Sequence, residues 1–311
     1  MSVAALQFKN YRIICEIGSG GLGKVYKAID MRTGRTVAVK VLHKKYQQSR
    51  RFLGIFHREL LTVSRLRHKH IVEYLDSNFD PPSCYIVTEF VDGWSLYSIM
   101  KHFGRVPPLV ALCIGIDILQ GIDYLHLHDT VHSDLSSPNV MLDKTGRVLV
   151  TDFGLACVTD VEDYKNYMIG TPGYYSPEHI SQAAIIPRTD IYCVGLLIYE
   201  LIAAHKAVPA VKDRRDVLAA MKSIDFDRIA CTDRALQKSI VKLLKGALQF
   251  NASRRTKSTE VMMFEIYRIL KKHNIRYARL GIRQLLVDSR LAPPGDFAPQ
   301  DIYHGQVDFE P

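Results

Sequence analysis

The sequence lacks the cysteine spacings that build disulfide frameworks or zinc sites. Its six cysteines lie far apart, and no two of them form a CxxC pair. Scattered cysteines of this kind are typical of reduced thiols inside a cell. The six are Cys15, Cys84, Cys113, Cys157, Cys193 and Cys231.

The sequence also has no recognisable targeting or membrane segment. Its first ten residues do not follow the charged-then-apolar pattern of a signal peptide. The longest apolar stretch, Ile191 to Ala204, is too short to span a bilayer and contains Glu200. We therefore expect a cytoplasmic protein with no membrane partner.

The charge balance is basic, whereas the rest of the composition is that of an ordinary globular protein. The 311 residues are 47% hydrophobic and 23% charged, with a formal net charge of +9. Basic residues gather between Arg254 and Arg283 without forming one stripe. We interpret them as a solvated surface, with a polyanion-binding site as the alternative, and we do not expect nucleic acid binding.

The two parts of the chain have different hydrophobic periods. From Tyr11 to about Phe90, short β-branched runs broken by turn residues predict an antiparallel sheet. One helix is predicted within this part, because apolar residues from Phe52 to Leu66 recur close to every 3.6 positions. Its apolar face should pack on the sheet.

Beyond Asp92 and Gly93, the apolar period is helical. We predict helices at 107–128, 189–204, 234–248 and 258–273, separated by loops with Pro and Gly. From 274 to 311 the chain should become an extended or mobile tail. The fold class is therefore α+β, with a small sheet part and a larger helical part.

A glycine-rich segment follows the first strand-like run. Gly18, Gly20 and Gly23 form GxGxxG, and glycines at this spacing let backbone N–H groups approach phosphate oxygens. A plain hairpin turn remains an alternative reading. A dinucleotide-binding fold fits less well, because the following KVYKAI is strand-like rather than helical.

Lys40 and Glu59 are charged residues in apolar surroundings. Lys40 ends the strand-like run Val37 to Lys40, and Glu59 stands in the middle of the predicted helix. A single strand lysine is usually just solvated, but an unpaired carboxylate among apolar residues is costly. Pairing the two would hold the ammonium ready for a phosphate oxygen.

The densest polar cluster is HSDLSSPN at residues 132–139, followed by a short hairpin and then Asp152-Phe153-Gly154. Asp134, Asn139 and Asp152 can converge from loops on either side of that hairpin. Hard oxygen ligands of this type suit magnesium. The alternative is that either aspartate is only a turn former.

Taken together and in this order, these motifs resemble the eukaryotic-type serine/threonine protein kinase family. The resemblance covers about residues 11–273 and includes GSGGLGKV, VAVK, the helix glutamate, HSDLSSPN, DFG, GTPGYYSPE and TDIYCVG. It implies a bilobal protein-kinase-like fold with an N-lobe (11–89), a hinge (89–93) and a C-lobe (94–273). Residues 1–10 and 274–311 would be an N-terminal extension and a C-terminal tail.

The resemblance implies a role for each motif residue, with ATP and Mg²⁺ as cofactors. Lys40, held by Glu59, would contact the α- and β-phosphates. Asp134 would orient the substrate hydroxyl and accept its proton, while Asn139 and Asp152 would hold the metal. The residues implied to bind ATP are Ile17, Gly18, Gly20, Gly23, Val25, Ala38, Lys40, Thr88, Glu89, Val91 and Met141.

Within that set, the resemblance implies that backbone groups of Glu89 and Val91 contact adenine and that Thr88 is the gatekeeper residue. Residues 155–176 match the activation loop. Thr171 would reach toward the catalytic aspartate, as in serine/threonine kinases. In the helical part, Glu178 would pair with Arg255, and Asp190 would brace the catalytic loop.

Three positions depart from the family pattern. Ser133 replaces the arginine that usually precedes the catalytic aspartate and anchors a phosphorylated activation loop. Ser136 replaces a lysine that usually contacts the transferred phosphate, so slow turnover is expected. Asn251-Ala252 replaces Asp-Pro and should affect only a local turn.

We therefore expect an enzyme that transfers the γ-phosphate of ATP to serine or threonine hydroxyls of protein substrates, with autophosphorylation among its reactions. The first alternative is an ATP-binding pseudokinase scaffold, although the intact lysine, glutamate, two aspartates and asparagine argue against it. The second is a small-molecule phosphotransferase, which would not need the peptide-docking GTPGYYSPE segment.

Overall fold

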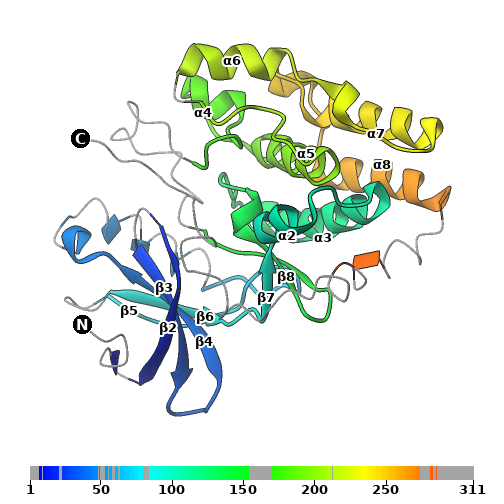
Figure 1. The fold of residues 1–311 in the computed structure, drawn as a ribbon. Helices are drawn as coiled ribbons and strands as arrows, with labels where there is room; N and C mark the ends of the chain where they lie inside the picture. The colour runs from blue at the N-terminus through cyan, green and yellow to red at the C-terminus, as the bar shows by residue number, and fades with distance from the viewer. Residues whose placement is uncertain are drawn as a thin grey trace.

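The structure is a computed structural model. It describes residues 7–8, 10–20, 23–47, 49, 53–54, 56–57, 60–61, 64–79, 84–153, 170–211, 213–273, 281–282 and 285. Figure 1 shows two lobes, a sheet lobe built from the first part of the chain and a helical lobe built from the rest. This confirms the predicted fold class.

The sheet of the first lobe has six strands in the order β1-β2-β3-β4-β6-β5, and every neighbouring pair is antiparallel. The strands are β1 (Gln7–Phe8), β2 (Tyr11–Ser19), β3 (Gly23–Asp30), β4 (Thr36–Leu42), β5 (Tyr74–Asn78) and β6 (Tyr85–Glu89). The first strand lies within the expected N-terminal extension, yet it pairs with β2.

The predicted helix of this lobe packs on the sheet as expected. Residues 53–54, 56–57 and 60–61 are helical, and Phe56 is fully buried. Its aromatic ring lies in one apolar cluster with Leu42 of β4 and Ile86 of β6. The helix is therefore fixed to the sheet by apolar contact.

The second lobe begins with a small sheet, β7-β8-β9, and continues with helices. The strands are β7 (Gly93–Ser95), β8 (Val140–Asp143) and β9 (Val148–Val150). The α-helices are α2 (Leu96–Phe103), α3 (Pro108–His126), α4 (Pro177–Ser181), α5 (Pro187–Ala203), α6 (Arg214–Lys222), α7 (Arg234–Ala247) and α8 (Thr259–Lys271). Short 3₁₀ turns complete it at η3 (Ser137–Asn139), η6 (Phe226–Arg228) and η7 (Ala252–Arg254), while η2 (Lys44–Tyr46) follows β4.

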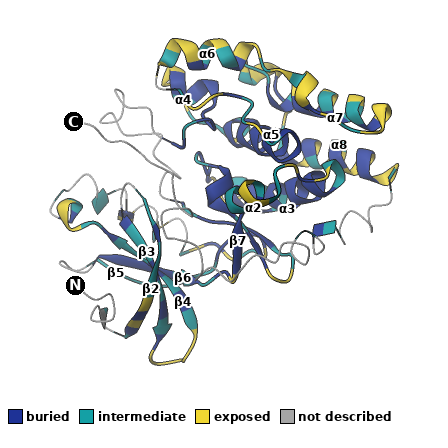
Figure 2. Cartoon of the chain, in the orientation of Figure 1, coloured by how far each residue is buried: buried dark blue, intermediate teal, exposed yellow. Residues whose placement is uncertain are grey.

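The core of the helical lobe is built around α3 and α5. Figure 2 shows both helices mostly buried, whereas α6 and α7 each expose one side. By length and composition α3 could cross a membrane, and it is a stronger candidate than the stretch from Ile191 to Ala204. Most of its residues are buried inside the lobe, as the core helix of a folded domain requires.

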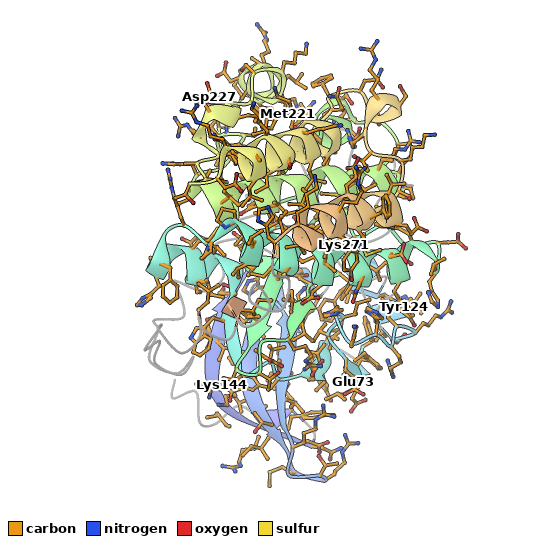
Figure 3. All side chains as sticks on the ribbon, turned by 90° about the vertical axis from the view of Figure 1, so that its right-hand side faces the viewer. Glu73, Tyr124, Lys144, Met221, Asp227 and Lys271 are labelled. Atoms are coloured by element: carbon orange, nitrogen blue, oxygen red, sulfur yellow. The ribbon has the colours of Figure 1, made fainter. Side chains whose placement is uncertain are left out.

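Backbone contacts join the two lobes next to β9. The segment before β5 forms a parallel bridge from Ile71 to Val150, and Val72 N–H donates to the Val150 carbonyl at 3.0 Å. Near the hinge, Lys144 pairs with Asp92, with 2.7 Å between Nζ and Oδ2. Figure 3 views this side of the molecule, with Glu73 and Lys144 beside the strands and Lys271 in the helical lobe.

Candidate active site

One face of the first sheet carries Lys40 together with three of the predicted ATP-binding residues. Val25 on β3 pairs with Lys40, and Ala38 on β4 pairs with Thr88 on β6. Paired residues, and alternate residues along a strand, share a face, and all four of these are partly exposed. Their neighbours along the strands are buried on the other face, namely Tyr26, Val37, Val39 and Val87.

Lys40 points from this face toward the loop that follows β9. Its Nζ lies 2.8 Å from Asp152 Oδ1, and the two side chains are 19% and 31% exposed. The first sheet and the helical lobe therefore contribute one charge each to the same ion pair. The predicted partner, Glu59, lies outside the described residues, as does Gly154 of the DFG motif.

Asp134 is held by hydrogen bonds from two separate segments. Thr171 donates to Asp134 Oδ1 from its N–H at 2.9 Å and from its hydroxyl at 2.8 Å. Asn139 Nδ2 donates to the carbonyl of Asp134 at 2.9 Å and to its Oδ2 at 3.1 Å. The predicted contact from Thr171 to this aspartate is present.

The electrostatic surroundings of Asp134 favour the protonated acid. Burial raises its pKa, the charge of Asp152 raises it further, and the bonds from Thr171 and Asn139 lower it, with the result at about 7. The carboxyl group is therefore poised to gain or lose a proton close to neutral pH.

Asn139 and Asp152 are brought together by the hairpin between them. Thr151 donates to the Asn139 carbonyl from its N–H at 2.9 Å and from its hydroxyl at 3.1 Å. Because Asn139 uses its amide nitrogen on Asp134, its amide oxygen is the atom able to bind a cation. An amide oxygen and a carboxylate are hard ligands, so this pair fits magnesium.

Asp190 on α5 holds the loop that carries Asp134, as predicted. Its side chain is fully buried and accepts the N–H groups of His132 and Ser133, each at 2.9 Å. Its Oδ2 also lies 2.9 Å from His126 Nε2. The bonds matter because Ser133 has φ of 61°, a left-handed conformation that serine seldom adopts.

His132 links this loop to the segment that bears Asp152, a contact that sequence reasoning did not assign. The imidazole is fully buried, and burial lowers its pKa. Its Nδ1 accepts the N–H of Asp134 at 3.2 Å, so Nε2 donates to the Thr151 carbonyl at 3.1 Å. Asp152 itself has φ of 59°, a second strained residue of the site.

The three glycines of the GxGxxG motif lie at the adjoining ends of β2 and β3. Gly18 pairs with Val25, and Gly20 N–H donates to the Gly23 carbonyl at 2.8 Å. A Cβ on Gly23 would lie 2.3 Å from the Val41 carbonyl oxygen, so this position has no room for a side chain. Ile17, which precedes Gly18, lies at a bulge in β2 and is partly exposed.

The predicted hinge connects β6 to β7. Glu89 uses its carboxylate on the helical lobe, where it accepts from Arg147 at 2.8 Å, and its N–H donates to the Glu73 carbonyl at 2.8 Å. Val91 is buried, whereas Met141 on β8 is partly exposed. These residues come from both lobes and therefore flank the junction between them.

The predicted ion pair between Glu178 and Arg255 is also present. Arg255 Nη2 lies 2.9 Å from Glu178 Oε1, and both residues are buried. Burial raises the pKa of Glu178, but the bonds from Arg255 outweigh this and leave the pKa below its usual value. Arg255 therefore does not belong to the exposed basic surface that the sequence suggested.

The chain matches the family model of the protein kinase domain over residues 11–265. It is 31% identical over 204 residues to the serine/threonine-protein kinase PknL of Mycobacterium tuberculosis, which covers 65% of this chain and 51% of that protein. It is 34% identical over 197 residues to the serine/threonine-protein kinase PrkC of Bacillus subtilis, covering 63% and 30%. The chain thus spans about half or less of the length of these relatives.

The fold has a counterpart among solved structures. The crystal structure of the Mycobacterium tuberculosis PknI kinase domain matches with a TM-score of 0.67 and 22% identity, over 86% of this chain and all of that chain. This likeness concerns the fold. Because the family model covers most of the sequence, the chain belongs to the eukaryotic-type protein kinase family.

Proposed function

We propose that this chain transfers the γ-phosphate of ATP to serine or threonine hydroxyls of protein substrates. Members of its family generally use ATP and Mg²⁺. The observation that carries the proposal is the arrangement of Asp134, which touches both Thr171 and Asn139, next to the ion pair of Lys40 and Asp152. These are the side chains that phosphate transfer between ATP and a hydroxyl requires.

Asp134 is proposed as the residue that orients the substrate hydroxyl and accepts its proton. Its Oδ1 already accepts two hydrogen bonds and its Oδ2 accepts one. A carboxylate offers about four acceptor positions, so one on Oδ2 is not used by any described residue. A pKa of about 7 matches a base that takes a proton as the new oxygen–phosphorus bond forms.

Lys40, Asn139 and Asp152 are proposed to hold the charged end of the nucleotide. Lys40 would contact the α- and β-phosphates, and Glu59 remains its proposed partner. Asn139 and Asp152 would hold magnesium through oxygen atoms. The bound metal would supply neutralisation of phosphate charge.

The remaining ATP-binding residues are proposed to enclose adenine between the lobes. The exposed face with Val25, Ala38 and Thr88 would form one wall, and Met141 of β8 the other. Backbone groups of Glu89 and Val91 would meet the adenine edge. Glu89 uses its side chain on Arg147 and its N–H on the Glu73 carbonyl, so its own carbonyl is the group proposed to meet adenine.

Purified protein incubated with ATP, magnesium and a generic basic protein should transfer phosphate to Ser or Thr. Asp134→Asn and Lys40→Met should abolish transfer, and phosphoamino-acid analysis should find no phosphotyrosine. Mass spectrometry of the chain itself would test autophosphorylation. If wild type binds ATP but transfers no more phosphate than these variants, the chain is a scaffold.

A further inference from the structure

The turn that carries Thr171 is held from a second side by a lysine outside the family motifs. Lys206 follows α5, and its Nζ donates to the Pro172 carbonyl at 2.7 Å. The helix ends at Ala203, and Ala204 has φ of 56°, which turns the chain at this point. Two consecutive residues of one turn are therefore fixed by different groups, Thr171 by Asp134 and Pro172 by Lys206.

The aliphatic part of Lys206 packs against the same turn. Its Nζ lies 4.7 Å from the centre of the Tyr174 ring. A Cβ on Gly173 would come within 2.5 Å of Lys206 Cδ, and Gly173 has φ of 88°. The lysine thus occupies the space that any larger residue at 173 would need.

Lys206, itself half-buried, adjoins a buried polar cluster that reaches the catalytic loop. Tyr174 donates to Glu200 of α5, and its hydroxyl lies 2.5 Å from Ser137 Oγ, three residues after Asp134. Burial lowers the pKa of Lys206, whereas the charge of Glu200 raises it. A half-buried lysine beside one acid and one carbonyl is not an ordinary solvated side chain.

We propose that Lys206 is a positioning residue, which clamps the turn 171–174 so that Thr171 stays bonded to Asp134 when a protein substrate docks. This inference rests on the proposed kinase activity. Lys206 touches neither Asp134 nor the ion pair of Lys40 in the described contacts, so it acts through the turn. Its loss should impair use of the protein substrate and leave ATP binding intact.

The test is steady-state kinetics of the full chain with ATP, magnesium and a generic basic protein. Lys206→Met keeps the length of the side chain and removes the donor. We expect kcat/KM for the protein substrate to fall about tenfold or more, because hydrogen bonds to charged groups contribute at least that factor. KM for ATP should change less than about twofold, because no contact to the nucleotide face is lost.

Lys222→Met is the matched control. Lys222 also lies over an aromatic ring, 5.1 Å from the centre of Phe250, but it is exposed and is far from the turn in sequence. Its kinetics should equal those of wild type. If Lys206→Met raises KM for ATP as much as it impairs use of the protein substrate, its role is general stability, and the proposal is overturned.

A double-mutant cycle tests the route of the effect. Thr171→Ala should remove most of what Lys206 provides, so the double variant should be no slower than Thr171→Ala alone. If the double variant loses activity by the product of the two single-variant factors, the proposal is overturned. If Lys206→Met does not fold, Lys206→Gln decides by the same criteria, because it keeps a polar group at this half-exposed position but is too short to reach the Pro172 carbonyl in the same way.

The outcomes also separate this inference from the proposed function. A wild-type chain that transfers no phosphate refutes both. If wild type and Lys206→Met are equally active, only the proposed role of Lys206 is refuted. Thermal unfolding of each variant, measured alongside, shows whether a kinetic loss reflects the fold.

Discussion

Replacing Asp190 with asparagine perturbs the support of the catalytic loop without touching the reacting groups. Asp190 is completely buried and accepts the N–H groups of His132 and Ser133, one on each carboxylate oxygen. Asparagine has one oxygen and one NH₂ in that plane, so one of the two N–H groups would face another donor. The variant keeps the size of the side chain, which excludes a cavity as the cause.

The expected loss of stability follows from the buried N–H group that is left without an acceptor. A buried N–H left without an acceptor costs about 1–3 kcal/mol. Part of this loss falls on Ser133, whose φ of 61° needs those bonds. Because Asp134 comes next in the chain, we expect kcat to fall about tenfold, the factor that corresponds to about 1.4 kcal/mol, within that range.

Urea unfolding measures the stability of each variant. Steady-state kinetics with a protein substrate measures its kcat. Asp213→Asn is the matched control, since Asp213 also accepts two backbone N–H groups, those of Arg215 and Asp216, but at an exposed helix start. Asparagine caps helices about as well as aspartate, so this change should stay within about 0.5 kcal/mol. The reasoning fails if Asp190→Asn is as stable and as active as wild type.

Three further predictions use other contacts of the site. Thr171→Ser keeps both bonds to Asp134 and should retain kcat, whereas Thr171→Ala loses the hydroxyl bond, worth about 1.5–3 kcal/mol, and should be at least tenfold slower in a peptide assay. Glu178→Gln should cost about 3–5 kcal/mol at neutral pH, because it leaves the buried charge of Arg255 unpaired. Since the folded-state pKa of Glu178 is lowered, its contribution is present above its unfolded pKa of about 4.3 and is lost as pH falls through the folded value. Urea midpoints of the variant should therefore depend less on pH in that acid range than those of wild type. Gly23→Ala should lower both the melting temperature and the affinity for ATP, because its Cβ would lie 2.3 Å from a carbonyl oxygen of β4, while a Cβ on Gly20 would meet nothing closer than 3.9 Å.

The long core helices could be predicted from the sequence because their apolar residues recur over many turns. The predicted 107–128 and 234–248 correspond to α3 (Pro108–His126) and α7 (Arg234–Ala247). Short or exposed elements gave no such signal. We did not predict α6, because only Val217 and Met221 of its nine residues are buried, nor β1, which has two residues.

Candidate site residues within motifs could be named from the sequence, but only some of their contacts could be predicted. The bonds to Asp190 and from Thr171 were expected from the resemblance to kinases. The link from Tyr174 to Glu200 and Lys206 was not, because it joins residues 26 or more positions apart and has no local pattern. Such contacts depend on how helices pack, and one sequence does not display that packing.

The serine at position 133 departs from the motif, yet hydrogen bonds to the backbone hold the loop around it. The backbone of Ser133 is held by Asp190 through its N–H and by the imidazole of His179 on α4. These bonds act on the peptide groups, so they would hold any residue able to adopt φ of 61°. An arginine side chain is therefore not needed to place Asp134 beside Thr171.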